Sequence, residues 1–438
     1  MGALSVSVDE AARGARVRPR VVEIYAAAAA DWNRAAGIVG RSFRSARELR
    51  SHERRFASEA VYGMIRGRRR YAFEATGADD APPDVLYLVW LLREIGDAPS
   101  VRAELSSLGV DLRELDTAGD RLERIADPIA RLAVRESYPD WIVRRLVAER
   151  GLDETARLCA AMNRRAPLTA RANRLKNTAG ELVARLKEEG VIAHQAPLAE
   201  DGVVLDTHLN AFGLAAFREG RFELQDVASQ CAAELVAPPP RGSVLDACAG
   251  AGGKTLALGA RLANRGRLVA LDVSERKLEE LKERARRAGL TNVQALLVDD
   301  FFARGERTEA LPLFDRVLCD APCSGLGVIR RHPETRWRLQ PGELDELPGT
   351  QRAILDRYAE RVAPGGRLIY ATCTVTAVEN DQVVDGFLAA HPSFEEAPAK
   401  EILGSERALA IGDGRRLRLL PHVHDTDGFF AAVLRRKA

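Results

Sequence analysis

The sequence predicts a doubly wound, Rossmann-like α/β sheet in the C-terminal part of the chain, preceded by an all-helical domain and a small α+β domain. Apolar residues recur at three- and four-residue spacing over residues 1–136, which is typical of packed helices. The pattern over residues 137–236 mixes short helical runs with short strand-like runs. Beyond the proline run at 238–240, short apolar runs alternate with charged amphipathic stretches, as in βαβ units.

Length and composition limit the class of protein. A chain of 438 residues exceeds what one hydrophobic core usually organises, so we expect three domains, at residues 1–136, 137–236 and 237–438. With 46% hydrophobic and 29% charged residues, the chain is too apolar to be disordered. The 65 Lys and Arg against 63 Asp and Glu give a formal charge of +2, which excludes a highly basic nucleic-acid coat protein. Any surface for nucleic acid must therefore be a local patch.

Two local basic patches occur in the first half of the chain. Residues 41–70 hold ten arginines against three acidic residues. Four of these arginines stand almost together: Arg66, Arg68, Arg69 and Arg70. Residues 163–176 hold five basic residues and no acidic one. Each patch could contact a phosphate backbone, and each could equally be a solvated face, so the sequence leaves both interpretations open.

Five short apolar runs predict the parallel strands of the α/β sheet. They are residues 244–246, 268–272, 295–299, 316–320 and 367–373. Nearly every run ends in Asp or Cys, and ligands of such sheets bind at the carboxyl ends of the strands. The last part of the chain adds two strand-like runs that predict a hairpin-like closure, at residues 417–420 and 428–434.

A glycine-rich loop follows the first of these strands. An ATP-binding P-loop would need glycine where Cys248 stands, and a dinucleotide fingerprint would need it where Thr255 stands. A site for S-adenosylmethionine needs a tight glycine turn here and acidic residues at the ends of the next two strands. Asp272 fits the first of these positions, and Asp299 or Asp300 fits the second. The alternative is that the glycines form only a turn and the aspartates only cap helices.

Two cysteines stand at the ends of the fourth and fifth predicted strands. Neighbouring strands would bring Cys323, Cys373 and Asp320 to one crevice beside the glycine-rich loop. A thiol beside S-adenosylmethionine suits methylation of an unactivated pyrimidine carbon, because a thiolate that adds to C6 makes C5 nucleophilic. A carboxyl group at Asp320 could bind the N3/N4 edge of such a cytosine. No histidine clusters with these thiols, so we expect no metal.

The remaining features predict a cytoplasmic protein. The six cysteines form no C-x-x-C pair, so we expect reduced thiols, with Cys159, Cys231 and Cys319 as packing residues. The apolar run at residues 85–92 is far shorter than the ~18–20 residues that span a bilayer. We therefore expect no membrane partner.

Several runs of residues carry a family resemblance. They are Asp320-Ala321-Pro322-Cys323-Ser324-Gly325, residues 327–337, Thr372-Cys373, residues 222–230 and Ala166-Pro167-Leu168-Thr169. These runs resemble the NOL/NOP2/Sun family of RNA cytosine-C5 methyltransferases, and most of all its bacterial members that modify 16S ribosomal RNA. The resemblance covers about residues 137–438. The helical N-terminus, through residues 53–56 and 61–70, resembles NusB-like RNA-binding domains.

The resemblance implies a class I methyltransferase sheet, an all-α NusB-like domain and a small α+β RNA-binding domain. It implies that Cys373 is the nucleophile, that Cys323 assists proton removal or product release, and that Asp320 shares their site. It further implies that S-adenosylmethionine binds these residues: Cys248, Ala249, Gly250, Ala251, Gly252, Gly253, Lys254, Asp272, Asp300 and Asp320. The family commonly has Ala-Pro at positions 250–251, and this departure should alter the stiffness of the loop more than its ligand.

The expected function is transfer of a methyl group from S-adenosylmethionine to C5 of a cytosine in RNA. We expect 16S rRNA or a small-subunit precursor as the partner, and a monomeric enzyme. One alternative is a 5-methylcytosine methyltransferase for tRNA or another rRNA site. The other is a non-catalytic RNA-binding factor of ribosome assembly that keeps the fold.

Overall fold

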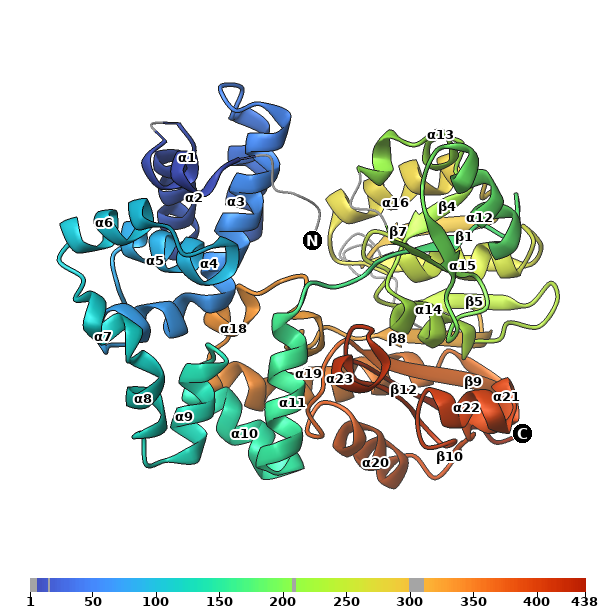
Figure 1. Cartoon of the computed structure of the whole chain (residues 1–438). Coiled ribbons are helices and arrows are strands. Elements are labelled where there is room, and N and C mark those ends of the chain that lie inside the picture. Colours follow the sequence, from blue (N-terminus) through green and yellow to red (C-terminus); the bar gives the residue numbers. More distant parts are fainter. Residues whose placement is uncertain (1–5, 15, 207–209, 299–310) are drawn as a thin grey trace. The chain divides into compact units, whose positions relative to one another are not determined.

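The computed structural model describes residues 6–14, 16–206, 210–298 and 311–438, and it divides the chain into two compact units. The helical unit comprises Met1–Arg164 and Ile329–Pro341. The sheet unit comprises Arg165–Val328 and Gly342–Ala438. Figure 1 shows the elements of both units. The helical unit is therefore made of two stretches that lie far apart in the sequence.

Every regular element described in the helical unit is a helix, as the sequence predicts. These helices are α1 (Val8–Arg13), α2 (Val17–Ala30), α3 (Ala35–Ser45), α4 (Ser51–Thr76), α5 (Pro83–Trp90), η1 (Leu91–Ile95), α6 (Pro99–Ser107), α7 (Leu112–Asp116), α8 (Ala118–Glu123), α9 (Pro128–Arg135), α10 (Asp140–Arg150), α11 (Leu152–Asn163) and α18 (Thr335–Arg338). Val61, Met64 and Ile65 of α4 are buried in the core, which confirms the helical period seen in the sequence. The α4 helix ends at Thr76, and the following Gly77 adopts the left-handed conformation (φ 75°) common after a helix.

A small antiparallel sheet begins the sheet unit, with strand order β2-β3-β1-β4. Its strands are β1 (Leu168–Ala172), β2 (Ala193–Gln195), β3 (Gly202–Leu205) and β4 (Phe222–Leu224). The helix α12 (Ala179–Glu188) begins at a capping box, in which Thr178 and Glu181 satisfy each other's backbone N–H groups. Leu182 and Leu186 of this helix share a buried cluster with Phe222 of the sheet.

The larger sheet has eight strands in the order β10-β12-β9-β8-β5-β6-β7, with β11 paired to β12. The strands are β5 (Ser243–Asp246), β6 (Arg267–Asp272), β7 (Val293–Leu297), β8 (Phe314–Asp320), β9 (Val362–Thr372), β10 (Phe394–Glu396), β11 (Leu417–Leu419) and β12 (Phe429–Arg436). Strands β5, β6, β7, β8 and β9 are parallel, and they confirm the five predicted strands. The antiparallel pairing of β11 with β12 confirms the predicted closure, and β12 also pairs antiparallel with β9.

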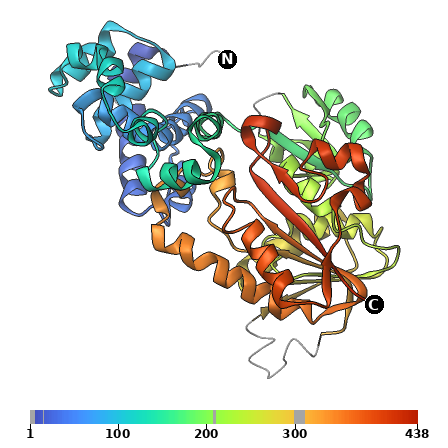
Figure 2. The ribbon, with the colours of Figure 1, turned by 90° about the horizontal axis from the view of Figure 1, so that it is seen from below.

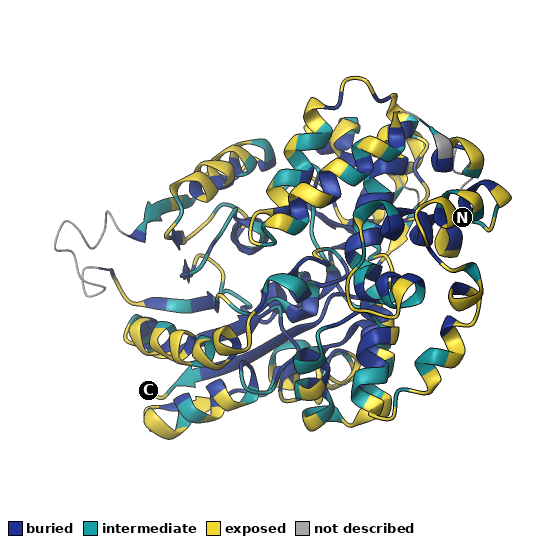
Figure 3. Ribbon diagram, turned by 90° about the vertical axis from the view of Figure 1, so that its left-hand side faces the viewer, coloured by how far each residue is buried: buried dark blue, intermediate teal, exposed yellow. Residues whose placement is uncertain are grey.

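Alternate side chains of each central strand face two different layers of helices. Leu268 and Ala270 of β6 belong to a buried cluster with residues of α14 (Val227–Glu234), α15 (Gly253–Arg261) and α16 (Glu275–Ala288). Val269 and Leu271 belong to a second cluster with residues of α19 (Pro341–Ala359) and α20 (Asp381–Ala390). Figure 2 shows helices beside these strands, and Figure 3 shows that the strands are mostly buried while the helices carry exposed residues on their outer faces. The sheet is therefore covered on both faces, as a doubly wound sheet requires.

The sheet unit contains further helices. They are η2 (Ala211–Gly213), α13 (Ala215–Arg218), α14 (Val227–Glu234), α15 (Gly253–Arg261), α16 (Glu275–Ala288), η4 (Leu326–Val328), α19 (Pro341–Ala359), α20 (Asp381–Ala390), α21 (Ala399–Leu403), α22 (Ser405–Ala410) and α23 (Pro421–His424). Among all helices of the described residues, none is both long enough and apolar enough to cross a membrane.

Candidate active site

The glycine-rich loop joins the end of β5 to the start of α15. Gly250 and Gly252 adopt left-handed conformations, with φ of 55° and 85°. A Cβ on Gly252 would lie 2.6 Å from Cγ of Leu281, so a larger residue would disturb the packing of α16. The Gly250 N–H donates to Oδ2 of Asp272 at 2.8 Å. The loop and the end of the second parallel strand therefore meet, as predicted.

The same arrangement fits the methionine and ribose parts of S-adenosylmethionine. Among the described residues, apart from Gly250 itself and its two chain neighbours, no heavy atom lies within 4 Å of the place where a Cβ would stand on Gly250, so the loop has open space at this point. Asp272 accepts one bond on each carboxylate oxygen, from Gly250 and from the Ser274 N–H at 2.9 Å. Each oxygen keeps a second lone pair for a ribose hydroxyl. The predicted acids at the third strand, Asp299 and Asp300, lie outside the described residues.

A buried carboxyl group lies where β5 meets the glycine-rich loop. Asp246, the last residue of β5, accepts a hydrogen bond from Oγ1 of Thr255 at 2.7 Å. Burial, with a further contribution from the charge of Asp320, raises the pKa of Asp246 to about 7. Burial and the neighbouring charge of Asp246 also raise the pKa of the Cys248 thiol. Cys248 is therefore a neutral loop residue and a poor nucleophile.

Arg171 of the small antiparallel sheet contacts the end of the glycine-rich loop. Its guanidinium donates to the carbonyl oxygen of Gly253 at 2.7 Å, and it also bonds the side chain of Gln225. Arg171 is buried, and this burial lowers its pKa to about 10. An RNA-facing role for Arg171 is therefore wrong.

Two more residues of the 163–176 patch contact other segments of the sheet unit. Arg174 pairs with Asp201 at 2.7 Å. Lys176 donates to the backbone carbonyl oxygens of Glu219 and Arg287. Both residues are also exposed, so an RNA-facing role of the 163–176 patch stays a prediction at these two positions.

The two predicted thiols come together at the carboxyl ends of β8 and β9. These strands are parallel neighbours, with Asp320 opposite Ala371. The Sγ atoms of Cys323 and Cys373 are 3.4 Å apart, and neither cysteine forms a disulfide. The hydrogen bond with Cys373 raises the pKa of Cys323 well above its usual range, and burial raises it further. Cys323 is therefore held as a thiol, and it can donate to a thiolate on Cys373.

A lysine from the glycine-rich loop faces the predicted catalytic carboxylate. Lys254 Nζ lies 2.6 Å from Oδ2 of Asp320. The ammonium group also lies 4.6 Å from the centroid of the Phe429 ring, at the start of β12. The Lys254 side chain is only 8% exposed and that of Asp320 is 29% exposed, so the carboxylate is the more accessible of the two. This ion pair joins the loop region to the end of β8.

A buried glutamate that the sequence analysis missed connects the two cysteine segments. Glu379 has no exposed surface. Its Oε1 accepts from the Ser324 N–H at 2.8 Å and from Nε2 of Gln351 at 3.1 Å. Its Oε2 accepts from the hydroxyls of Ser324 (2.6 Å), Thr374 (3.0 Å) and Thr376 (2.8 Å). Ser324 follows Cys323 and Thr374 follows Cys373, so one carboxylate holds both thiol segments.

The sequence signal for this glutamate is weak. Glu379 stands just before α20, where an acidic residue is favourable for the helix dipole alone. Only the unusual run of threonines at 372, 374 and 376 suggests a shared polar partner.

Two glycines allow the segments around the thiols to approach closely. The Gly327 N–H donates to the carbonyl oxygen of Cys373 at 3.0 Å, and the Gly428 N–H donates to that of Gly327 at 2.8 Å. A Cβ on Gly327 would lie 2.1 Å from the Gly428 oxygen. The Cys323 segment, the Cys373 segment and the start of β12 are therefore fixed together by backbone contacts.

The arginines at positions 66, 69 and 70 have different surroundings. Arg69 is buried and donates to Asp79, Asp140 and the carbonyl oxygen of Tyr138, so its interpretation as an RNA-facing residue is wrong. Arg66 and Arg70 line a cavity of about 300 Å³ within the helical unit, together with other residues that include Arg135, Arg164, Tyr71 and Trp90.

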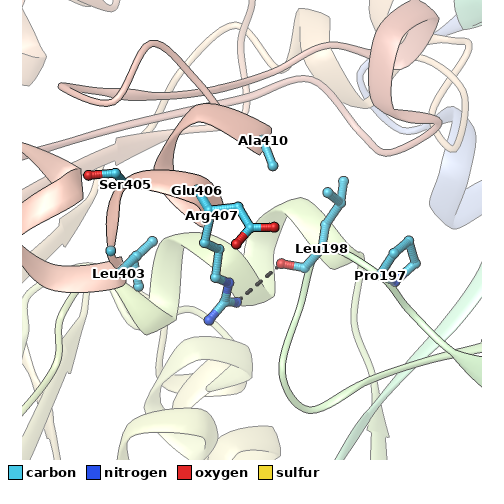
Figure 4. Close-up of a pocket in the computed structure, with 8 residues that line it drawn as sticks. Pro197, Leu198, Leu403, Ser405, Glu406, Arg407 and Ala410 are labelled. Carbon is cyan, nitrogen blue, oxygen red and sulfur yellow. Dashed lines mark hydrogen bonds between the residues drawn. The ribbon is translucent and has the colours of Figure 1, made fainter.

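Three further cysteines and one further cavity are not among the site residues described above. Cys159, Cys231 and Cys319 are fully buried, which confirms them as packing residues. A cavity of about 400 Å³ in the sheet unit is lined by Leu198, Arg407 and neighbouring residues, and it includes none of the predicted site residues (Figure 4).

Comparisons with known proteins agree with this geometry. Residues 233–435 match the model of the family described as 16S rRNA methyltransferase RsmB/F. Residues 138–211 match the model of the RsmF/B-like ferredoxin-like domain. Two matching models thus cover most of the sheet unit and the end of the helical unit.

Two curated relatives extend the match. The probable ribosomal RNA small subunit methyltransferase B of Bacillus subtilis is 32% identical over 415 residues, covering 89% of this chain and 92% of the relative. Ribosomal RNA small subunit methyltransferase B of Vibrio cholerae is 35% identical over 309 residues, covering 70% of this chain and 67% of the relative.

Solved structures show the same fold. The crystal structure of the protein PH0851 has a TM-score of 0.76 at 26% identity, over 99% of this chain and 100% of that chain. A methyltransferase homolog from Pyrococcus horikoshii has a TM-score of 0.60 at 28% identity, over 71% of this chain and 100% of that chain. S-adenosylmethionine is accordingly the cofactor. The chain belongs to the RsmB/F family of 16S rRNA methyltransferases.

Proposed function

We propose that the protein transfers a methyl group from S-adenosylmethionine to C5 of a cytosine in 16S rRNA. The observation that carries this proposal is the pair of thiols 3.4 Å apart at the ends of β8 and β9, with the Lys254–Asp320 ion pair on the same strand end as Cys323. An ordinary RNA methyltransferase acting on an oxygen or nitrogen atom needs no thiol, whereas C5 of cytosine is not nucleophilic until a thiolate adds at C6.

Cys373 is the proposed nucleophile. Its thiolate forms a bond to C6, and the electron pair of the C5–C6 double bond becomes available at C5. Asp320 binds the N3/N4 edge of the ring, and Lys254 holds that carboxylate in place at 2.6 Å. S-adenosylmethionine supplies an electrophilic methyl group to C5. The target base must leave its stack to reach this position.

Cys323 is the proposed assistant in product release. After methylation the C5 proton leaves to a base, the C5–C6 double bond forms again, and the Cys373–C6 bond breaks. Cys323 lies 3.4 Å from the leaving sulfur. Its raised pKa disfavours it as the attacking thiolate, and the same property makes it a strong base once it is ionised.

The other parts of the chain fit the same proposal. The proposed cofactor site comprises residues 248–254 with Asp272, Asp300 and Asp320. We further propose a NusB-like RNA-binding domain at residues 1–136, an α+β RNA-binding subdomain at 137–236 and a catalytic domain at 237–438, acting as a monomer. The two thiols 3.4 Å apart at the accessible Asp320 carboxylate favour an enzyme over a non-catalytic assembly factor, because RNA binding alone needs no such pair.

The test is methylation of unmodified 16S rRNA by the purified protein, with mapping of the modified base. Cys373→Ala should abolish methyl transfer, whereas Cys323→Ala should accumulate a protein–RNA adduct that survives denaturant. Cys159→Ala, which removes a buried thiol of the helical unit, should do neither. Methylation of tRNA or another rRNA in preference to 16S rRNA would replace the proposed substrate, and inactive Cys323→Ala without an adduct would exchange the roles of the two thiols.

A further inference from the structure

The large sheet carries a row of arginines near the edge at which its parallel strands begin. This amino edge is opposite the carboxyl edge, where Cys323 and Cys373 follow β8 and β9. Arg316 of β8 lies beside Arg367 of β9, and Arg367 lies beside Arg435 of β12. Residues paired in this way share one face of the sheet, on strands ~5 Å apart. The three side chains therefore form one row across three neighbouring strands.

The same face of the sheet is apolar two residues further along each strand. Leu318, Ile369 and Val433 are again paired across β8, β9 and β12, and all three belong to the buried cluster that includes residues of α14 and α16. At the amino edge this apolar row gives way to three half-buried cations. Like charges on neighbouring strands repel one another, so the row is unfavourable unless anions offset it.

Among the described residues, only one arginine of the row has carboxylate partners. Arg435 pairs with Glu395 at 2.7 Å and with Glu401 at 3.6 Å. Arg316 donates to three backbone carbonyl oxygens and to no carboxylate of the described structure. Arg367 has neither a hydrogen bond nor an ion pair with any described residue. Two adjacent guanidinium groups are thus left without a paired anion.

Burial and mutual repulsion both act against the charge on these two arginines. Burial and the neighbouring charge of Arg367 lower the pKa of Arg316 to about 10, and the Asp315 carboxylate opposes this shift only in part. Burial and the charge of Arg435 lower the pKa of Arg367, against a smaller opposite effect of Glu401. A guanidinium stays charged at neutral pH, so an anion placed beside both groups would relieve their repulsion.

Three exposed arginines extend the amino edge over β5 and β6. Arg267 is the first residue of β6, and Arg241 and Arg265 lie just before β5 and β6. The two segments touch, because the Arg267 N–H donates to the carbonyl oxygen of Gly242 at 3.1 Å. None of these three side chains has a hydrogen bond or an ion pair in the described part of the chain. Since β5 is the neighbour of β8, the basic edge runs from β9 to β6.

The length of this edge suits a chain of phosphates better than one small anion. From β9 through β8 and β5 to β6 the edge crosses three strand spacings, which is ~15 Å. Neighbouring phosphates of one nucleic-acid strand are several times closer than this, so the edge can contact more than one of them. Guanidinium groups also match the geometry of phosphate oxygens.

We propose that the amino edge of the large sheet is a second RNA-binding surface, which holds phosphates of the RNA backbone away from the place of methyl transfer. Its residues are Arg241, Arg265, Arg267, Arg316 and Arg367. The proposal rests on the proposed function for the identity of the RNA. Arg316 stands four residues before Asp320 on β8, ~13 Å along the strand, so a longer RNA is needed to contact both edges. Phosphate contacts position RNA without reading its sequence.

The test replaces two arginines that hold no other part of the described structure. Arg367→Gln and Arg267→Gln each remove one positive charge and no side-chain hydrogen bond. Arg352→Gln is the matched control. Arg352 is exposed and has no side-chain hydrogen bond or ion pair among the described residues, and its helix α19 packs on the other face of the sheet. Filter binding of the full-length protein to an unmodified fragment of 16S rRNA, at several salt concentrations, gives the Kd and its salt dependence.

The edge variants should bind RNA more weakly than the control. We expect each single variant to raise the Kd about threefold or more at low salt, and the double variant about tenfold or more. The slope of log Kd against log salt concentration should fall by about 0.7 for each lost contact. Arg352→Gln should keep both quantities close to those of the unchanged protein. The Kd for S-adenosylmethionine should stay the same in every variant, which shows that the sheet is intact.

The outcomes separate this proposal from the proposed function. Weaker RNA binding in the edge variants alone would support the surface, even in a protein that methylates no cytosine. An equal effect of Arg352→Gln would overturn the surface, because only net charge would then matter, and so would unchanged RNA binding in the double variant. Calorimetry in which inorganic phosphate binds the unchanged protein but not the double variant, with equal RNA binding by both, would replace the RNA by a small anion.

Discussion

Replacing Glu379 tests whether one carboxylate holds the two thiol segments. Glu379→Ala removes the acceptor of the Ser324 N–H, which is fixed in the backbone, whereas the Gln351 amide keeps the Pro322 carbonyl oxygen and the three hydroxyls can turn to other partners. A buried donor without a partner costs ~1–3 kcal/mol, so this N–H and the lost packing together give a loss of about 2–4 kcal/mol. Glu379→Gln keeps an oxygen for the Ser324 N–H and offers an amide to the hydroxyls, so we expect a loss of about 1–2 kcal/mol.

The glutamine variant also changes the chemistry of Cys323. The negative charge of Glu379 contributes to the raised pKa of Cys323, after the hydrogen bond with Cys373 and burial. Glu379→Gln removes that charge, so the pKa of Cys323 falls and the thiolate forms at lower pH. Alkylation by iodoacetamide, followed at the Cys323 peptide by mass spectrometry across pH, should shift to lower pH.

Urea denaturation of the same variants measures the loss of stability. Glu396→Gln is the matched control: Glu396 is a nearly buried carboxylate that accepts from Nε of Arg416 at 2.8 Å and has no hydrogen bond to either thiol segment in the described structure. It should lower stability and leave Cys323 alkylation unchanged. A loss below about 1 kcal/mol in Glu379→Ala, or identical alkylation profiles for the two glutamine variants, would refute the reasoning.

Two further predictions follow from the charged groups. The pKa of Asp246 is raised from 3.8 to about 7, so this carboxyl contributes stability that is present below pH 4 and is lost as the pH rises through 7. Asp246→Asn should therefore flatten the pH dependence of unfolding by up to about 4 kcal/mol between these limits, and an unchanged profile in urea titrations at several pH values would contradict this. Replacing Arg66 and Arg70 by Gln should weaken RNA binding, measured by filter binding, and should reduce the slope of log Kd against log salt concentration by roughly 2. Arg69→Gln should instead lower the thermal midpoint of unfolding, measured by calorimetry.

The sheet and the place of the site were predictable because their signals are local. Each parallel strand is a short apolar run, and the residue types at the strand ends, such as Asp272 and Cys373, show which edge carries the chemistry. The role of Glu379 was not predictable in this way. Its donors come from residues 324, 351, 374 and 376, and only the folded sheet brings these segments together.

The basic patches show where composition and periodicity lead to different conclusions. Four arginines at 66–70 form one charge cluster in the sequence, but they lie on a helix with 3.6 residues per turn. Arg69 stands four residues after the buried Ile65 and eight after the buried Val61, so the same period that predicts the core also directs Arg69 inward. Asp79 and Asp140 then satisfy its guanidinium. A charge cluster on a helix therefore has to be divided by helix face before it is assigned to RNA, and here that division separates the buried Arg69 from the half-buried Arg66, Arg68 and Arg70.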